Sequence, residues 1–388
     1  MRIAVIQSSL NMLGGAEKLC ITAIKALQEA GHRVTLVSVD KTDWLLMQKR
    51  YSISCRVDRE LYLIPNILET SSMISRMIIT LFALFANPAL WRLKRDHDVV
   101  LNMSGDIICL GEDAAYVNAL PLKAALDYQE ILPRRNSLWR FGGKAYGLFL
   151  GVQNKLNRGR FLLTNSSFNA VMIKKYFGRS AVVVYPPVDV VALKHALTGV
   201  KTENLVVSVS RFRLGKNLEW IPRIAKNVQN ARFLIVGSRD KASTTAVGEI
   251  SRVSHGMCVE NRVELVFDRP FSDILEILRR AKILLQTQRT EAFGMAVVEA
   301  MAAGCVPVVP RDGGPWFDIL EREEGKYGFS YRSLDEAAKK IRMLLENEDL
   351  RAEVSARAAK RAMAFDSSIF ERKILRIVER IYCSKRAW

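Results

Sequence analysis

Apolar runs and amphipathic segments alternate along most of the chain. Residues 2–7 and 34–39 are short apolar runs typical of buried strands, and residues 16–30 have the apolar spacing of one helix face. Gly31 marks the end of that helix. A strand, a helix and a second strand in this order form a βαβ unit, which predicts a parallel, doubly wound sheet.

The same alternation returns in the second half of the chain. It predicts further strands, with helices between them, at residues 205–209, 233–236, 264–267, 283–286 and 306–309. Pro186 and Pro187 stiffen the backbone before this region, as suits a connection between domains. A length of 388 residues also favours two domains. We therefore predict an α/β fold with two Rossmann-like, doubly wound sheets.

The stretch 288–309 carries the strongest chemical signal. Glu291 lies in a loop after the strand 283–286, and Glu299 lies about two turns into the following helix, which Gly304 ends. Ligands of open α/β sheets bind at this edge. The backbone N–H groups of the first predicted helical turn favour an anion, and the glycine allows its close approach; they belong to Phe293, Gly294 and Met295. The alternative is a pair of helix-end carboxylates without a ligand.

Two cations follow the strand 205–209 and precede the next helix. Arg211 offers a planar guanidinium and Lys216 a mobile ammonium, which together can clamp a diphosphate and neutralise it as it leaves. Arg213 is the alternative to Arg211, and two solvated surface cations are the alternative to a clamp. In the first half, Gly14 and Gly15 form a strand-to-helix turn that can cradle a diphosphate, although their spacing does not match the dinucleotide-binding fingerprint.

The sequence T-E-A-F-G-M-A-V-V-E at 290–299 resembles the retaining nucleotide-sugar glycosyltransferases of family 4, which have the GT-B fold. The resemblance implies that Glu291 contacts hydroxyls of the donor sugar and that Glu299 holds the nucleotide ribose. It also implies that Arg211 and Lys216 bind the donor phosphates, which the glycine loop at Gly14 and Gly15 faces. Glu291, Arg211 and Lys216 are therefore the expected catalytic residues.

The GT-B fold implies two Rossmann-like domains that face a cleft. We expect an acceptor-side domain at residues 1–190, a nucleotide-sugar-binding domain at 191–366, and a C-terminal helix at 367–388 that crosses back to the first domain. An apolar stripe suits that docking and comprises Phe370, Ile374, Ile377 and Ile381.

Three further motifs resemble the lipid-linked-oligosaccharide α-1,2-mannosyltransferases: the segments that begin at Thr164, Val184 and Asp312. The resemblance implies transfer of mannose from GDP-mannose to a dolichol- or polyprenol-linked glycan. A UDP-sugar, such as UDP-glucose or UDP-N-acetylglucosamine, is the alternative donor. Asp106 and Tyr116 are the candidate acceptor-side residues. Asn118 stands where the family commonly has histidine, and asparagine cannot titrate.

The net charge of +18 is compatible with nucleic acid, an anionic membrane surface or a phosphorylated ligand. Residues 73–89 contain an apolar core, 77–86, that is too short to span a bilayer; it fits an interfacial helix or a buried one. Residues 134–160 are basic with interleaved aromatic residues, typical of a lipid-headgroup or a nucleic-acid surface. We favour the membrane surface and expect no nucleic acid, with a basic nucleic-acid-binding protein as the alternative.

We expect no cofactor and no essential metal, because positive side chains and helix dipoles can stabilise the leaving diphosphate. The six cysteines are scattered and suggest free thiols rather than a zinc site. No signal peptide is visible at the N-terminus, so we expect a protein at the cytoplasmic face of a membrane. Other GT-B enzymes remain as alternatives: an epimerase would turn over UDP-sugar without an acceptor, and a phosphorylase would need a cofactor lysine.

Overall fold

The computed structural model describes residues 1–11, 14–51, 53–64, 87–104, 112–121, 124, 161–196, 203–239 and 243–386. These residues form two compact units. The first comprises Met1–Pro187 and Ser368–Trp388, and the second comprises Val188–Ser367. The division falls at Pro187, beside the two prolines that the sequence marks as a connection.

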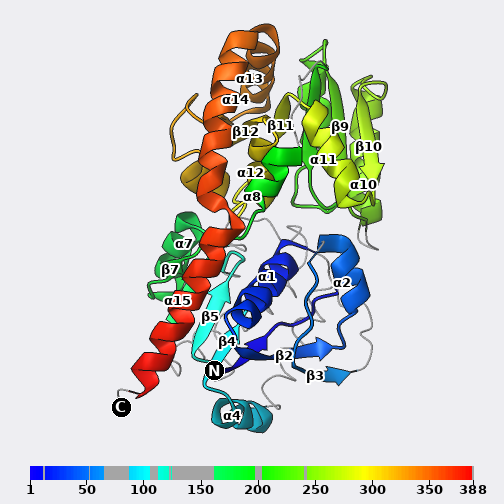
Figure 1. The fold of residues 1–388 in the computed structure, drawn as a ribbon. Coiled ribbons are helices and arrows are strands. Elements are labelled where there is room, and N and C mark those ends of the chain that lie inside the picture. The colour runs from blue at the N-terminus through cyan, green and yellow to red at the C-terminus, as the bar shows by residue number, and fades with distance from the viewer. Residues whose placement is uncertain are drawn as a thin grey trace. The chain divides into compact units, whose positions relative to one another are not determined.

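The first unit is a seven-stranded parallel sheet with the order β3-β2-β1-β4-β5-β6-β7 (Figure 1). Its strands are β1 (Arg2–Ile6), β2 (Arg33–Asp40), β3 (Arg59–Ile64), β4 (Val99–Asn102), β5 (Ala114–Val117), β6 (Phe161–Thr164) and β7 (Val182–Val183). Its helices are α1 (Gly15–Glu29), α2 (Trp44–Tyr51), α4 (Asn87–Asp96), α7 (Ser167–Phe177) and nearly all of α15 (Ser367–Arg386).

Apolar residues on both faces of this sheet explain its layers. Helices α1 and α15 pack on one face, where Val5 and Leu101 meet Ile24 and Ile374. Helix α4 covers the other face through Leu93, and α7 covers it near β5 and β6. The C-terminal helix therefore belongs to the first sheet. Its buried stripe is Phe370, Ile374, Val378 and Ile381, whereas the predicted Ile377 is only partly buried at its margin.

The second unit is a six-stranded parallel sheet with the order β10-β9-β8-β11-β12-β13. Its strands are β8 (Leu205–Val209), β9 (Arg232–Gly237), β10 (Val263–Phe267), β11 (Ile283–Leu285), β12 (Val306–Pro310) and β13 (Phe329–Tyr331). Its longer helices are α8 (Val190–Ala196), α9 (Trp220–Lys226), α10 (Ser243–Gly256), α11 (Phe271–Arg280), α12 (Met295–Ala302), α13 (Leu334–Glu346) and α14 (Glu348–Ala362). A π-helical turn, η1 (Pro315–Ile319), and a 3-10 turn, η2 (Met363–Phe365), complete it.

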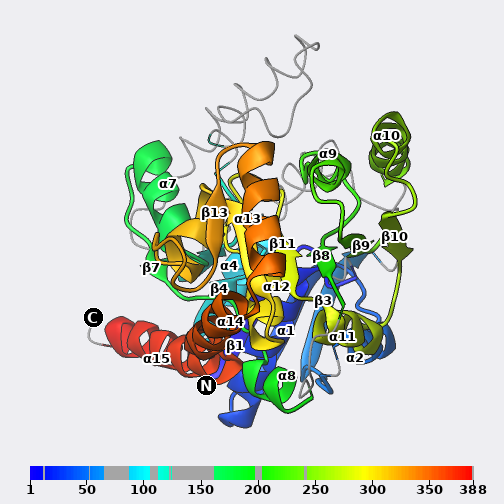
Figure 2. The same ribbon diagram turned by 90° about the horizontal axis from the view of Figure 1, so that it is seen from above.

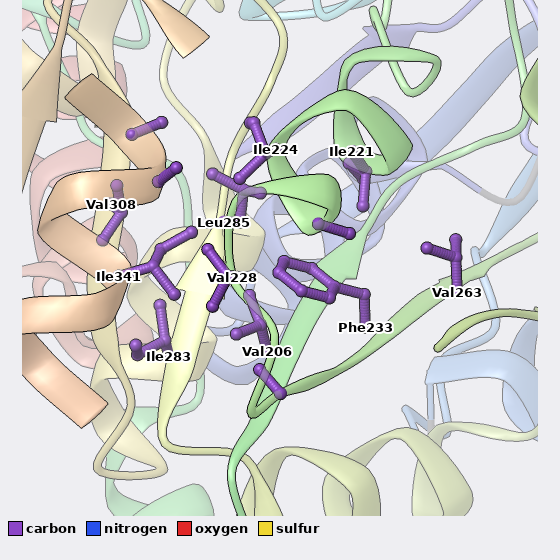
Figure 3. Packing of buried hydrophobic residues seen from close by; sticks show 14 of the residues in the cluster. Val206, Ile221, Ile224, Val228, Phe233, Val263, Ile283, Leu285, Val308 and Ile341 are labelled. Atoms are coloured by element: carbon purple, nitrogen blue, oxygen red, sulfur yellow. The ribbon is translucent and has the colours of Figure 1, made fainter. Parts of the chain in front are cut away.

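The core of the second unit lies between the sheet and the helices α9 and α13 (Figure 2). Figure 3 shows Phe233 and Ile283 from the strands against Ile224 and Ile341 from the two helices. Helices α11 and α12 contact β8 and β12 respectively, and Figure 2 shows them on the opposite side of the sheet. The sheet is thus covered on both faces, as a parallel sheet requires.

Strands β3, β5 and β13 were not anticipated from the sequence pattern. Five of the six cysteines lie in the described residues, and all five are free thiols. Within the described ranges, no helix combines the length and apolar composition needed to cross a membrane. The segments 73–86 and 134–160, on which the membrane interpretation of the sequence depends, lie outside the described residues.

Candidate functional site

Both sheets have the 3-2-1-4-5-6 strand order of the Rossmann fold, and β7 extends the first. In this order the chain leaves neighbouring central strands in opposite directions, which opens a crevice at their carboxyl ends. In the second sheet these strands are β8 and β11. The loop 210–219 follows β8 and the loop 286–294 follows β11. The predicted Lys216 and Glu291 therefore come from the two loops at this place, the switch point of the second sheet.

The structure joins these two residues directly. Lys216 Nζ lies 3.1 Å from Glu291 Oε2, although the residues are 75 positions apart in the chain. The same ammonium also donates a hydrogen bond to Oε1 of Gln288. The side chains of Lys216 and Glu291 are 24% and 21% exposed, so a ligand can reach both. An accessible cation beside a carboxylate can bind a phosphate and a sugar hydroxyl at neighbouring points.

Hydrogen bonds between the two loops fix the position of this pair. The hydroxyl of Thr287, which is fully buried, donates to the carbonyl oxygen of Lys216 over 2.7 Å. Asn217 Nδ2 donates to the Thr287 carbonyl oxygen over 3.3 Å. Burial raises the pKa of the Tyr331 hydroxyl, which stays protonated and donates to the Gln286 carbonyl oxygen over 2.8 Å. The backbone that carries Lys216 is thus bonded to the backbone that carries Glu291.

The backbone of two glycines packs directly against the loop that carries Glu291. A Cβ at Gly313 would lie 2.7 Å from the Glu291 carbonyl oxygen, and a Cβ at Gly314 would lie 2.3 Å from the Ala292 carbonyl oxygen. The Gly314 N–H donates to the Glu291 carbonyl oxygen over 2.7 Å. Only glycine permits this approach of the two backbones. The sequence places these glycines in a family motif but does not reveal that they position Glu291.

Helix α12 begins two residues later than predicted. Gly294 is its N-cap, with φ of +96°, a backbone conformation that glycine adopts readily. Met295 is the first helical residue, so the positive end of the helix dipole lies there. Phe293 precedes the helix, and its buried ring packs at 5.4 Å against Phe365. The first helical turn therefore begins at Met295 rather than at Phe293, because Gly294 forms a tight turn before it. The anion-binding role of Phe293, Gly294 and Met295 remains a prediction.

The other predicted residues of the second unit lie on the same elements. Arg211 is exposed on the loop after β8, and Arg213 is half-buried two residues later. Glu299 is the fifth residue of α12 and is half-buried. The roles predicted for Arg211 and Glu299 remain predictions.

In the first unit, Gly14 and Gly15 lie at the start of α1, after β1. The Gly14 N–H donates to Oε2 of Glu17 over 2.7 Å, and the Gly14 carbonyl oxygen accepts from the Tyr51 hydroxyl over 2.7 Å. Gly14 therefore serves as the N-cap of α1, and its N–H already has an acceptor. A phosphate at this N–H would have to displace the Glu17 carboxylate.

The two acceptor-side candidates have different outcomes. Asp106 lies outside the described residues. Tyr116 is a core residue of β5: its ring packs against Phe370, and its hydroxyl donates to the Val184 carbonyl oxygen over 2.5 Å. Burial raises its pKa well above the ordinary value, so it remains a neutral donor. The expected contact with an acceptor is not supported for Tyr116, because alternation along β5 turns its side chain into the sheet core.

Comparison with known proteins finds a family model that matches most of the second unit. Residues 189–361 match the model of glycosyl transferases group 1. The chain is 29% identical over 221 residues to the GDP-Man:Man(3)GlcNAc(2)-PP-Dol alpha-1,2-mannosyltransferase of Dictyostelium discoideum, covering 53% of this chain and 43% of that protein. It is 30% identical over 238 residues to the human protein of the same name, covering 57% and 48%. The chain thus spans about half the length of these curated relatives.

Solved structures extend the likeness to the whole chain. The crystal structure of Anabaena Alr3699/HepE in complex with UDP and glucose superimposes with a TM-score of 0.72 at 17% identity, covering 98% of this chain and 99% of that one. At this identity the likeness establishes the fold alone, and the predicted GT-B fold class is confirmed. The chain therefore has the GT-B fold, and its residues 189–361 match the model of glycosyl transferases group 1.

Proposed function

We propose that this protein is a retaining glycosyltransferase that moves mannose from GDP-mannose to a lipid-linked glycan at a membrane surface. The observation that carries the proposal is the ion pair of Lys216 and Glu291 at the switch point of the second sheet. In the reaction the bond between sugar C1 and the diphosphate oxygen breaks. An acceptor hydroxyl oxygen bonds to C1, and its proton is lost to the departing diphosphate or to solvent.

Each residue has a separate task in this reaction. Lys216 and Arg211 neutralise the diphosphate as negative charge develops on it, assisted by the positive end of α12 at Met295. Glu291 accepts hydrogen bonds from the sugar hydroxyls and orients C1 towards the acceptor. Glu299 holds the ribose. Because cationic side chains carry the charge of the leaving group, we propose that turnover needs no divalent metal and persists in EDTA.

The donor and the acceptor are proposed from the relatives. The names of the Dictyostelium and human relatives specify GDP-mannose and a dolichol-linked glycan. The Anabaena structure holds UDP and glucose, so a UDP-sugar is the alternative donor on the same fold. The proposal places donor binding in the second unit and acceptor binding in the first.

The membrane part of the proposal is supported by the outer face of α15. Arg372, Arg376 and Arg380 recur every four residues along this helix and are exposed. Like charges at this spacing destabilise a helix, so an anionic partner would stabilise it. In the described part of the chain, neither Arg372 nor Arg376 forms an ion pair. We propose that this face meets anionic lipid headgroups and holds the protein at the cytoplasmic face of the membrane.

A panel of nucleotide sugars tests the donor assignment. A ligand that binds the folded state raises the melting temperature by mass action, so GDP-mannose is expected to give the largest shift. Incubation of the selected donor with a lipid-linked glycan is expected to yield a longer glycan with retained configuration. Turnover of a UDP-sugar without any acceptor would instead establish an epimerase. Salt-sensitive oligonucleotide binding that survives Glu291→Ala, without any nucleotide-sugar shift, would support the nucleic-acid alternative.

A further inference from the structure

Gln288 is a third member of the Lys216–Glu291 site. It lies in the loop after β11, three residues before Glu291, and is half-buried. Lys216 Nζ donates to its Oε1 as well as to Oε2 of Glu291. The ammonium is thereby held between a charged and a neutral acceptor that come from one loop.

The partner of Lys216 determines how the Gln288 amide is oriented. An ammonium group has only donors, so it must face the oxygen of the amide, which leaves Nε2 on the other branch. In the ranges that the structure describes, Lys216 is the sole hydrogen-bond partner of the Gln288 side chain. Gln288 therefore presents two N–H donors beside a cation, an arrangement that suits an anionic oxygen.

The position of this donor in the site indicates which oxygen it meets. In the proposed function Glu291 orients the sugar, and the sugar is attached to the second phosphate of the nucleoside diphosphate. Lys216 touches Glu291, so the phosphate closest to Lys216 is the one that bears the sugar. Gln288 shares that ammonium. We propose that Gln288 Nε2 binds the sugar-bearing phosphate of the donor, while Oε1 keeps Lys216 beside the same phosphate; this inference rests on the proposed function.

Two substitutions separate this binding role from mere support of Lys216. Gln288→Glu keeps an oxygen acceptor for Lys216 but replaces the N–H donors with a negatively charged oxygen. Gln288→Met keeps the length of the side chain and removes both acceptor and donor. If Gln288 only supported Lys216, Gln288→Glu would bind a diphosphate as well as the unchanged protein does. If Gln288 contacts the phosphate, Gln288→Glu is the more damaging change.

The matched control is Gln229→Glu. Gln229 is exposed in the turn between α9 and β9, at the amino-terminal end of the strand and so at the opposite edge of the same sheet. The substitution Gln229→Glu makes the same change of charge as Gln288→Glu, but away from the loops that carry Lys216 and Glu291. Its effect on ligand binding measures the long-range contribution of one added negative charge.

The experiment is calorimetric titration of the full chain with GDP, GMP, UDP and UMP. We expect Gln288→Glu to weaken binding of the preferred diphosphate tenfold or more, and Gln288→Met to weaken it about threefold to tenfold. Binding of the matching monophosphate, which lacks the second phosphate, is expected to change less than threefold. Gln229→Glu is expected to leave both affinities within twofold.

The outcomes distinguish the inference from the proposed function. If the unchanged protein binds neither GDP nor UDP, the proposed function fails and the inference fails with it. If the unchanged protein binds a diphosphate and Gln288→Glu binds it equally well, the inference is overturned while the function stands. An equal loss of diphosphate and monophosphate affinity would also overturn it, since that shows a disturbed loop. Should Gln288→Glu not fold, Gln288→Met decides. A larger loss of diphosphate affinity than of monophosphate affinity supports the inference, and an equal loss overturns it.

Discussion

The two sheets share a strand order but present different charges at their carboxyl ends. At the switch point of the second sheet, the accessible ammonium of Lys216 lies between two loops. In the first sheet, the buried carboxylate of Asp40 at the end of β2 accepts hydrogen bonds from Ser9 and Asn11, over 3.0 and 2.7 Å. These described partners of Asp40 are neutral. The second edge therefore presents an accessible cation, whereas the first holds a buried carboxylate among neutral donors.

This difference separates what the fold determines from what the side chains determine. The strand order fixes where a crevice opens in each sheet, and it is the same in both units. The residues in the loops at that point fix the charge of the ligand. The contrast agrees with the proposed division, in which the second unit holds the nucleotide sugar and the first receives the acceptor.

The largest effect is expected from Glu291→Gln. It removes the charge that accepts hydrogen bonds from the sugar and that holds Lys216, so turnover is expected to fall a hundredfold or more, about 2.7 kcal/mol of transition-state stabilisation. Initial rates with GDP-mannose and a lipid-linked acceptor measure it. Glu264→Gln, exposed on β10, is the control and is expected to keep full activity. An unchanged rate in Glu291→Gln would remove Glu291 from the site.

A double substitution on α15, in the first unit, tests whether the outer face of this helix binds an anionic membrane. Arg372→Gln with Arg376→Gln removes two charges from the outer face, and each is worth about 1 kcal/mol near an anionic membrane. Partition onto phosphatidylserine-containing vesicles is therefore expected to fall about 30-fold. Arg252→Gln with Arg279→Gln makes the same change of charge in the second unit, where both arginines are paired with glutamates. An equal loss in both proteins would show that net charge alone, and not α15, governs binding.

Gly314→Ala tests whether the glycine support positions Glu291. Its Cβ would lie 2.3 Å from a backbone oxygen, so the loop must shift. We expect turnover to fall about tenfold, because a small displacement of a catalytic group is costly, together with a lower melting temperature. Gly248→Ala on α10 is the control: a Cβ there meets nothing within 4 Å, and alanine stabilises a helix by up to about 1 kcal/mol. Full turnover in Gly314→Ala would show that the close contact with Gly314 does not position Glu291.

The smallest effect on turnover is expected from Tyr116→Phe. The change leaves the Val184 carbonyl oxygen without its donor and costs about 1–3 kcal/mol of stability, measured by denaturant unfolding. Turnover per folded molecule is expected to stay the same, since the hydroxyl is buried in the first sheet. A loss of turnover at unchanged stability would restore the acceptor-side role predicted from the sequence.

The sequence predicts the strands that are short apolar runs bounded by polar residues. Strand β8 has the predicted bounds, 205–209, because its apolar run lies between the polar residues Asn204 and Ser210. Strand β3 was missed because Arg59 and Glu60 interrupt the apolar pattern at the edge of the sheet. Strand β13 has only three residues, too few for a period to show.

For the site, the sequence locates Lys216 and Glu291 because each is a charged residue after a predicted strand and because the surrounding motifs resemble those of family 4. It does not indicate Gln288, whose importance arises from a contact with a residue far away in the chain. A polar side chain three residues before Glu291 in the same loop was the available signal. The close approach of Gly313 and Gly314 to the Glu291 loop is likewise a tertiary contact, which no local pattern reveals.

The most direct test is calorimetric binding of GDP-mannose to the unchanged protein and to Lys216→Met. The central claim is that the switch point of the second sheet grips the diphosphate of a nucleotide sugar through Lys216. It predicts micromolar-range binding by the unchanged protein and a loss of at least tenfold in Lys216→Met, at an unaltered melting temperature without ligand. Equal binding by the two proteins would contradict the claim and place the donor elsewhere.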